Sequence, residues 1–330
     1  MANDPSKDPE RPEAPAGAGH LSHAEFRAQV KSTRAEIERG MQATKAQLDA
    51  TNERIQARTG RNLILAVLIG LAFGAVLLIS LIFVKEIFIV VAAACAAFAA
   101  FELTHALRGA GYVLPRTPTV IAAVAIIAAA YYGQETGQLI ALGAGLVLCW
   151  GWRLGMALAP AYRRHWRTLI RDLGAIALVQ LYAALLASFS MLLLEKDGGQ
   201  WWTLAFIVLV VAADTGAYAS GLLFGKHPMA PSISPKKTWE GFAGAAVTSV
   251  IAGILLAVFM VHQPLWFGII FGVVILLTAT LGDLAESLIK RDIGVKDMSS
   301  WLPGHGGFLD RLDSILPSAV AAYALFRIFG

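Results

Sequence analysis

Long apolar runs separated by short polar segments dominate the chain from about residue 62 to its C-terminus. A helix needs roughly 20 apolar residues to cross a bilayer, and runs of about this length recur along the chain. We expect about nine transmembrane helices, of which the third and the ninth are short. Their approximate ranges are 63–84, 87–107, 117–133, 137–158, 172–194, 201–224, 240–261, 265–285 and 312–328. The pattern predicts an all-α, polytopic integral membrane protein.

The residues before the first apolar run have a different pattern. Residues 1–20 are rich in Pro, Ala, Gly and charged residues, which cannot bury enough apolar surface to fold, so we expect a disordered tail. Residues 21–58 lack Pro and carry a thin apolar seam, which predicts a long helix that is either solvated or dimerising. The seam residues are Val30, Ile37, Met41, Leu48 and Ile55. We therefore divide the chain into a soluble N-terminal extension, residues 1–60, and a transmembrane domain, residues 61–330.

The composition agrees with a membrane protein. Hydrophobic residues make up 57% of the chain and charged residues only 15%, whereas about 25% of the residues of a typical soluble domain are charged. The mean hydropathy is +0.62. The net charge of +4 is modest, and we expect the chain to associate with a lipid bilayer and with no nucleic acid.

The positions of Lys and Arg predict the orientation in the membrane. The connections after the even-numbered spans hold Arg108, Arg116, Arg163, Arg164, Arg167, Arg171, Lys226, Lys236, Lys237, Lys290, Arg291, Lys296 and Arg311. Those after the odd-numbered spans hold only Lys85 and Lys196. Because cytoplasmic loops carry the excess of Lys and Arg, we expect the N-terminus and the even connections in the cytoplasm. Arg327 is an exception near the outer end, and we expect Arg153, inside the fourth span, to snorkel to the cytoplasmic interface.

One candidate for chemistry is the stretch VAADTGAYASGLLFGKH, residues 211–227, because Asp214 lies within the sixth span. A carboxylate at membrane depth is costly and is usually functional. The alternative is an aspartate that forms a hydrogen bond to a neighbouring helix, helped by Thr215 or Tyr218. The glycines of the stretch favour close approach of helices. They are Gly216, Gly221 and Gly225.

A second candidate is SISPKKTWEG, residues 232–241. Ser234 or Thr238 would cap the seventh span, with Glu240 near the positive N-terminal end of that helix. Lys236 and Lys237 have the charge to bind phosphate oxygens. The alternative is that the two lysines only orient the helix.

A third candidate lies at the end of the eighth span and the start of the ninth. Asp283 and Glu286 are three residues apart, and Lys290 lies near the same helical face as Asp283. Asp310 and Asp313 have the same spacing and would share one face of a helix. Carboxylate oxygens beside a cationic patch suggest Mg²⁺ with phosphates, for which Asp283, Asp310 and Asp313 are sufficient. The alternative is an ordinary charged loop with helix-capping aspartates.

Between these carboxylates lie Lys290 and Arg291, at the membrane boundary, and His305 among glycines that allow close approach to a ligand. Without a Cys/His cluster the sequence does not suggest zinc. It also has no Walker A loop, Rossmann fingerprint or G-x-S-x-G elbow. These features predict a cytoplasm-facing site for magnesium and phosphate, and the substrate is expected to be lipid-borne because the charges lie at headgroup level.

The third candidate also resembles a family signature. The stretch SLIKRDIGVKDMSSWLPGHGGFLDRLD, residues 287–313, is similar to the signature of phosphatidate cytidylyltransferases, also called CDP-diacylglycerol synthases. The stretches DTGAY, FGK, SPKKTWEG and GDLAES resemble secondary motifs of that family, so that the resemblance covers residues 211–315. Spans one to five resemble the family only in being apolar, and residues 1–60 are outside its usual pattern. The matching signature positions are Ser287, Lys290, Arg291, Lys296, Asp297, His305, Gly306, Gly307, Asp310, Arg311 and Asp313.

The resemblance implies that residues 61–330 form a catalytic domain of phospholipid biosynthesis. The implied reaction is CTP + phosphatidate → CDP-diacylglycerol + pyrophosphate, with Mg²⁺, a second cation such as K⁺, and a homodimer. It would proceed by in-line attack of the lipid phosphate on the α-phosphorus of CTP. The site would face the cytoplasm from a bacterial-type inner membrane.

The resemblance also implies roles for individual residues. Metal ligands would be Asp283 and Asp310, with Asp313 beside them and Asp214 completing the polar cavity or holding the second cation. Catalytic groups on the phosphates would be Lys290, Arg291, Arg311 and His305, the last without an assigned step. Substrate-binding residues would be Lys236, Lys237, Ser234, Lys226, Lys296, Gly306 and Gly307.

Two other functions stay open from the sequence. One is another nucleotide–lipid transferase or a lipid kinase. The other is an ion-coupled transporter, with Asp214, Asp283 and Glu102 along an ion path. Transport needs access from both faces, whereas these charges gather on one side. Glu102, at the end of the second span, would otherwise join the cavity of the enzyme.

Overall fold

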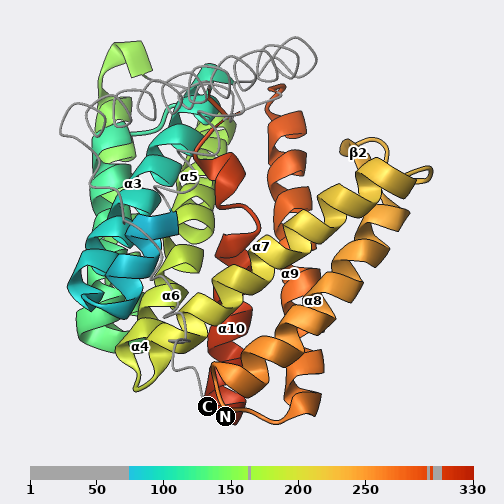
Figure 1. Cartoon of the computed structure of the whole chain (residues 1–330). Helices are drawn as coiled ribbons and strands as arrows, with labels where there is room; N and C mark the ends of the chain where they lie inside the picture. Colours follow the sequence, from blue (N-terminus) through green and yellow to red (C-terminus); the bar gives the residue numbers. More distant parts are fainter. Residues whose placement is uncertain (1–73, 163–164, 296–297, 300–306) are drawn as a thin grey trace, which may run out of the picture. The chain divides into compact units, whose positions relative to one another are not determined.

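The computed structural model describes residues 74–162, 165–295, 298–299 and 307–330, and almost all regular structure in them is helical. The helices are α3 (Lys85–Gly109), α4 (Arg116–Leu158), α5 (Trp166–Val179), α6 (Leu186–Glu195), α7 (Gly199–Phe224), α8 (Trp239–Phe259), α9 (Leu265–Asp292) and α10 (Ile315–Phe329) (Figure 1). Shorter elements are the 3₁₀ turns η1 (Pro160–Tyr162) and η3 (Leu309–Arg311), the π-helix η2 (Gln180–Leu185), and the antiparallel strands β1 (Pro228–Ala230) and β2 (Ser234–Thr238). The expected all-α membrane fold is confirmed.

Six helices of the described residues are long and apolar enough to cross a membrane, when α5, η2 and α6 are taken as one helix over Trp166–Glu195. Helix α10 is apolar but shorter, with 15 residues. The first expected span lies mostly outside the described residues, as does the whole expected extension over residues 1–60. The count of about nine spans, which rests on the length needed to cross a bilayer, therefore stays a prediction.

Helix α4 folds back on itself at Gln134, whose backbone has φ 54° and ψ −152°. A Cβ atom at Gly145 would lie 2.9 Å from the Cβ of Ala122, so residues on either side of Gln134 are direct neighbours. This contact requires the two halves of α4 to run antiparallel. The halves correspond to the third and fourth expected spans, which the sequence places at 117–133 and 137–158.

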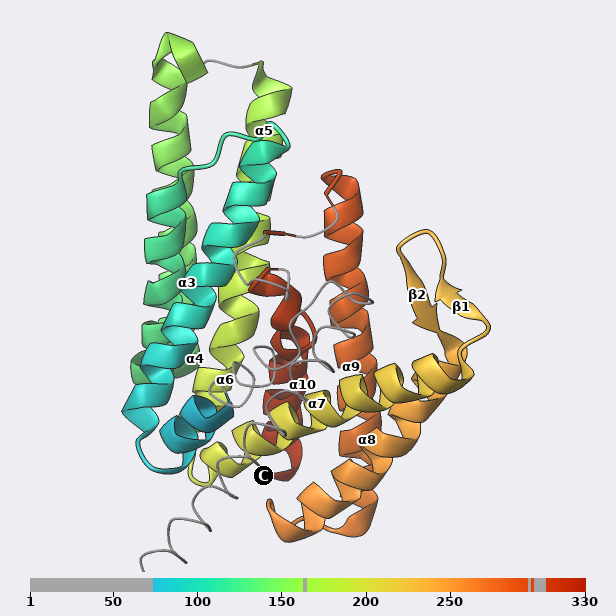
Figure 2. The ribbon, with the colours of Figure 1, turned by 45° about the horizontal axis from the view of Figure 1, so that its top comes forward.

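Helices α7, α8 and α9 meet through small residues. A Cβ at Gly216 on α7 would lie 2.1 Å from Oγ1 of Thr248 on α8, and one at Gly253 on α8 would lie 2.9 Å from the backbone of Gly272 on α9. Small residues let helix backbones approach closely in membranes. The expected packing role of Gly216 is thus confirmed, and Figure 2 shows α7 crossing obliquely to meet α8 beside α9, with the β1–β2 hairpin at the far end of α7.

Arg153 corrects one expectation from the sequence. Its side chain does not snorkel to the interface but is fully buried, with Nη2 2.8 Å from Oδ2 of Asp172 on α5, which is fully buried too. The other oxygen of Asp172 accepts a hydrogen bond from the backbone N–H of Val113 at 3.1 Å. A buried guanidinium is tolerated only when it is paired, and α5 supplies the partner.

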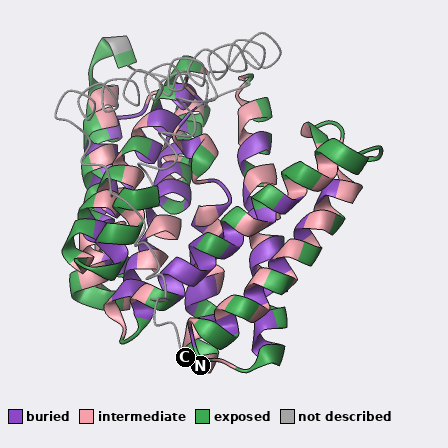
Figure 3. Ribbon diagram, viewed as in Figure 1, coloured by how far each residue is buried: buried purple, intermediate pink, exposed green. Residues whose placement is uncertain are grey.

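The described connections that are rich in Lys and Arg gather toward one end of the helices. In Figure 1 the α3–α4 connection, the start of α5 and the end of α9 lie at the top, whereas the turn at Gln134, the α6–α7 connection and the C-terminus lie at the bottom. The outward faces of the helices are largely exposed in Figure 3. They carry large apolar side chains such as Val147, Leu222 and Phe259, as expected for surfaces that contact lipid.

Candidate active site

The β1–β2 hairpin places Lys237 against α9. Its Nζ lies 2.6 Å from Oδ2 of Asp283. The hairpin leads directly into α8, where the Thr238 hydroxyl accepts a hydrogen bond from the N–H of Gly241 at 3.1 Å. Thr238 is therefore the cap of this helix, and Ser234, the other expected cap, begins β2 instead.

Glu240 ties the end of α7 to the start of α8. Its Oε2 accepts hydrogen bonds from the backbone N–H groups of Lys226 at 3.1 Å and His227 at 3.2 Å. Its Oε1 lies 2.5 Å from Nδ1 of His227. These bonds hold the beginning of the hairpin, so that Lys237 at its other end reaches α9 in a defined position.

A cavity of about 510 Å³ lies between the hairpin and helices α7, α8 and α9. Small and apolar residues form much of its wall, among them Ala213, Ala217, Gly221, Phe242 and Leu276. Charged and hydroxyl side chains line the rest, among them Asp214, Ser234, Lys236, Lys237, Thr280 and Asp283. The cavity can therefore hold a molecule that has both a charged and an apolar part.

Carboxylates converge on Lys237. Besides Asp283, which it contacts, both Asp214 on α7 and Asp313 have Lys237 and Asp283 as electrostatic neighbours. Asp313 is only 8% exposed, and its Oδ1 accepts the backbone N–H of Ser314 at 2.7 Å. Carboxylates this close disfavour one another's ionised form, and the ammonium group of Lys237 offsets part of that repulsion.

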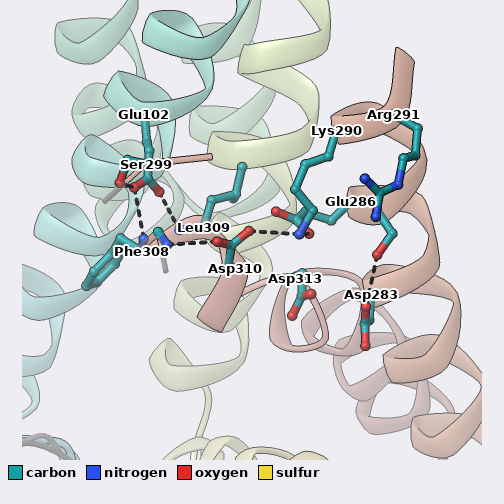
Figure 4. A network of polar contacts seen from close by, with 12 residues as sticks. Glu102, Asp283, Glu286, Lys290, Arg291, Ser299, Phe308, Leu309, Asp310 and Asp313 are labelled. Atoms are coloured by element: carbon teal, nitrogen blue, oxygen red, sulfur yellow. Dashed lines mark hydrogen bonds and ion pairs between the residues drawn. The ribbon is translucent and has the colours of Figure 1, made fainter. Parts of the chain in front are cut away.

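Lys290 connects a second pair of carboxylates (Figure 4). Its Nζ forms an ion pair with Glu286, one turn earlier on α9, and donates to Oδ1 of Asp310 at 2.9 Å. The N–H of Gly307 donates to Oδ2 of Asp310 at 2.7 Å. Burial raises the pKa of Asp310, but its hydrogen bonds, which include those from Gly307 and Lys290, outweigh this and lower the pKa below the usual value. Asp310 is therefore ionised at neutral pH.

Glu102 on α3 holds the loop that carries Asp310. It is 3% exposed, and it accepts hydrogen bonds from the N–H of Phe308 at 3.0 Å and of Leu309 at 2.6 Å. The Ser299 hydroxyl is a third donor (Figure 4). A Cβ at Gly307 would lie 2.7 Å from Oε1 of Glu102, so this glycine permits the close approach of the loop to α3.

Two expectations about the ends of this loop are wrong. Asp310 and Asp313 do not begin the last helix, because Asp310 lies in η3 and α10 starts only at Ile315. They also have different neighbours, since Asp310 accepts a hydrogen bond from Lys290, whereas Asp313 accepts one from the backbone N–H of Ser314 and has Asp283 as an electrostatic neighbour. Lys290, whose spacing puts it near the same helical face as Asp283, forms ion pairs with Glu286 and Asp310.

The other expected site residues are either exposed or lie outside the described residues. Arg291 is exposed, and its Nε donates to the carbonyl of Ile233 in the hairpin at 3.3 Å. Arg311 is exposed, with Asp214 as an electrostatic neighbour, and Lys226 is exposed at the end of α7. Lys296, His305 and Gly306 lie outside the described residues.

Expected metal ligands fall into two groups. Asp214, Asp283 and Asp313 surround Lys237, whereas Asp310 faces Lys290. Within the part of the chain that the structure describes, no three or more His, Cys, Asp or Glu side chains are arranged as a metal-binding cluster.

Glu286 and Glu102 were noted in the sequence but were given no catalytic, substrate-binding or metal-binding role in the expected enzyme site. Glu286 had a signal in the sequence, since it lies one turn before Lys290 within GDLAES. Glu102 had as its only signal a position at the end of an apolar run, and nothing in the sequence linked it to a loop 207 residues later.

Comparison with known proteins shows which family this chain resembles along most of its length. Residues 64–329 match the cytidylyltransferase family. A phosphatidate cytidylyltransferase of Mycobacterium bovis is 40% identical over 281 residues, which is 82% of this chain and 90% of the relative. One of Mycobacterium leprae is 41% identical over 283 residues, 82% of this chain and 89% of the relative. One of Haemophilus influenzae is 44% identical over 136 residues, 40% of this chain and 47% of the relative.

The matched family covers every helix and strand described above from α3 to α10. The chain belongs to the cytidylyltransferase family and is a membrane-embedded nucleotidyltransferase.

Proposed function

We propose that this enzyme transfers the cytidylyl group of CTP to phosphatidate, forming CDP-diacylglycerol and pyrophosphate for phospholipid biosynthesis. The observation that carries the proposal is the cavity between α7, α8 and α9, whose wall combines small apolar residues with Asp214, Lys237 and Asp283. An anionic lipid has the matching division into a charged head and an apolar tail. Relatives named phosphatidate cytidylyltransferase support the same substrates.

The transfer exchanges one phosphate bond for another. An oxygen of the phosphatidate phosphate forms a bond to the α-phosphorus of CTP in line with the leaving group. The bond from the α-phosphorus to the oxygen that bridges to the β-phosphate breaks, and pyrophosphate leaves with that electron pair. The attacking phosphate is already an anion, so the protein mainly has to position the substrates and neutralise charge.

The lysines and arginines of the site suit that task. Lys237 and Lys236 extend from the hairpin into the cavity and would hold the triphosphate or the lipid headgroup. Lys290 lies only 14% exposed between Glu286 and Asp310, where it would contact a phosphate and keep both carboxylates in place. Arg291 and Arg311, which are exposed, would bind phosphates at the edge of the site. The remaining residues proposed to bind substrate or take part in catalysis are Ser234, Lys226, Lys296, His305, Gly306 and Gly307.

The carboxylates fit Mg²⁺. Asp283, Asp214 and Asp313 bring negative charge together around a single lysine, and magnesium usually takes one or two protein carboxylates and completes its shell with water and phosphate. We therefore propose Asp283 and Asp313 as holders of Mg²⁺ beside Asp310, and Asp214 as the residue for a second cation such as K⁺. When bound, the ions would neutralise charge on the nucleotide phosphates.

The proposal places the site on the cytoplasmic side of the inner membrane of a bacterium. Cationic connections at the end of the helices that holds Lys290 support this orientation, as the positive-inside rule expects. CTP is available there, and phosphatidate would reach the cavity sideways from the inner leaflet. The family resemblance also supports a homodimer, which light scattering of the purified protein in detergent would test.

Product analysis tests the proposal. Purified protein in vesicles is given CTP or ATP with phosphatidate, diacylglycerol or a polyprenol, and mass spectrometry identifies the lipid product. We expect CDP-diacylglycerol from CTP and phosphatidate alone. A phosphorylated lipid from ATP would instead show a lipid kinase, and ion flux without any lipid product would show a transporter.

A further inference from the structure

The hydroxyl of Tyr182 is buried without a hydrogen-bond partner among the described residues. Tyr182 is 9% exposed and lies in η2, the π-helical segment between α5 and α6. A buried hydroxyl normally finds a partner, because leaving it unsatisfied is destabilising. π-helical segments also occur frequently at functional sites. Together these features suggest that the partner of Tyr182 comes from outside the chain.

The surroundings of Tyr182 indicate where such a partner would bind. Four carboxylates are electrostatic neighbours of the side chain: Asp283, Glu286, Asp310 and Asp313. The ring also belongs to one buried apolar cluster with Leu309 and Leu316, which flank Asp310 and Asp313 in sequence. Tyr182 therefore lies near both the carboxylates around Lys237 and those around Lys290.

We propose that the Tyr182 hydroxyl contacts the substrate directly, donating a hydrogen bond to a phosphate oxygen that binds between η2 and the carboxylates. This inference rests on the proposed transfer reaction. A phosphate there would lie near Lys290 as well, and a neutral donor would add stabilisation of the negative charge that develops in the transition state. The phosphate belongs either to phosphatidate or to CTP, which the experiment below separates.

Replacing Tyr182 with Phe removes only the hydroxyl. We expect Y182F to lower kcat/KM by about 10-fold or more, as for loss of one preorganised donor. Thermal stability should be unchanged or higher, because the variant no longer buries an unsatisfied polar group. A raised KM for phosphatidate alone would assign the contact to the lipid, and a raised KM for CTP alone would assign it to the nucleotide.

Tyr323 provides a matched control. Its hydroxyl has partners, since it donates to Glu135 and accepts from Arg327 at 3.1 Å, and these residues lie far from the carboxylates, at the turn of α4 and the end of α10. We expect Y323F to lower the melting temperature and to leave kcat and both KM values unchanged. The two variants should therefore show opposite patterns in stability and activity.

Ligand-induced shifts in melting temperature are measured in parallel with CTP and with phosphatidate in mixed micelles. Both CTP and phosphatidate should raise the melting temperature of the wild type. The ligand that the Tyr182 hydroxyl contacts should raise the melting temperature of Y182F by less than it raises that of the wild type. The inference is overturned if Y182F keeps both stabilisations and keeps kcat/KM within about twofold, or if its melting temperature falls as in Y323F. Failure of the wild type to form CDP-diacylglycerol would instead refute the proposed function, and the shifts would still decide the role of Tyr182.

Discussion

The carboxylate of Glu102 on α3 accepts a hydrogen bond from the backbone N–H of Leu309 at 2.6 Å, across 207 residues of sequence. Leu309 directly precedes Asp310, whose other neighbours are Lys290 and the N–H of Gly307. A helix outside the α7–α9 group thus determines where Asp310, an aspartate of the proposed site, lies. Glu102 therefore holds the loop that carries Asp310, and hydrogen bonds from that loop engage its carboxylate.

Replacement of Glu102 by Gln should disturb this loop. The carboxylate accepts from two backbone N–H groups and one hydroxyl, whereas an amide offers a single acceptor oxygen and turns an NH₂ group toward a donor. We expect kcat to fall by roughly 10-fold or more, because a small misplacement of a catalytic group is costly. Hydrogen exchange should rise in peptides that contain residues 307–312 and stay unchanged in α8. Normal kcat with unchanged exchange would show that Glu102 does not position Asp310.

Lys237 should act mainly on substrate binding. K237A removes the ammonium group that contacts Asp283 and lines the cavity. We expect KM for CTP or phosphatidate to rise by about 10-fold, because one charge-assisted contact with the substrate is lost. Steady-state kinetics with each substrate varied in turn measures this effect. K196A is the control, since Lys196 lies at the α6–α7 connection and pairs with Glu195. Equal KM values in K237A and the wild type would contradict the proposed role.

Metal dependence should be altered by D283N. EDTA should abolish activity of the wild type, and Mg²⁺ should restore it. D283N should lower kcat by about 100-fold, comparable to removing one strong electrostatic element, and raise the Mg²⁺ concentration needed for half-maximal activity. D214N should instead alter the response to K⁺. A normal Mg²⁺ requirement in D283N, or activity in EDTA, would exclude the proposed metal site.

The buried pair of Arg153 and Asp172 should matter for stability. D172N leaves a fully buried guanidinium without its counter-ion, which typically destabilises a protein by about 3–5 kcal/mol. We expect a clearly lower melting temperature in detergent. The double variant R153M/D172L should recover part of the loss, since no buried charge remains. A melting temperature of D172N equal to that of the wild type would mean that water or lipid satisfies Arg153.

Much of this protein could be predicted from its sequence because the relevant signals are local. The length of each apolar run is set by the thickness of a bilayer, and it located α3, both halves of α4, α7, α8 and α9. The motifs that contain Lys237 and Asp283 were both assigned to the site from the sequence. In the structure, Nζ of Lys237 lies 2.6 Å from Oδ2 of Asp283. Thr238 as a helix cap followed from rules that act within a few residues.

Pairings between distant helices could not be read in this way. The sequence determined that the chain is a helical membrane protein with charged motifs near one end of its helices, because hydrophobicity and local spacing suffice for that. Only the tertiary structure decided that Asp310 pairs with Lys290, that Glu102 holds the loop, that Arg153 is buried against Asp172, and that Tyr182 lies near the carboxylates. These partners depend on how each helix is rotated and packed against the others, which the spacing along one helix does not specify.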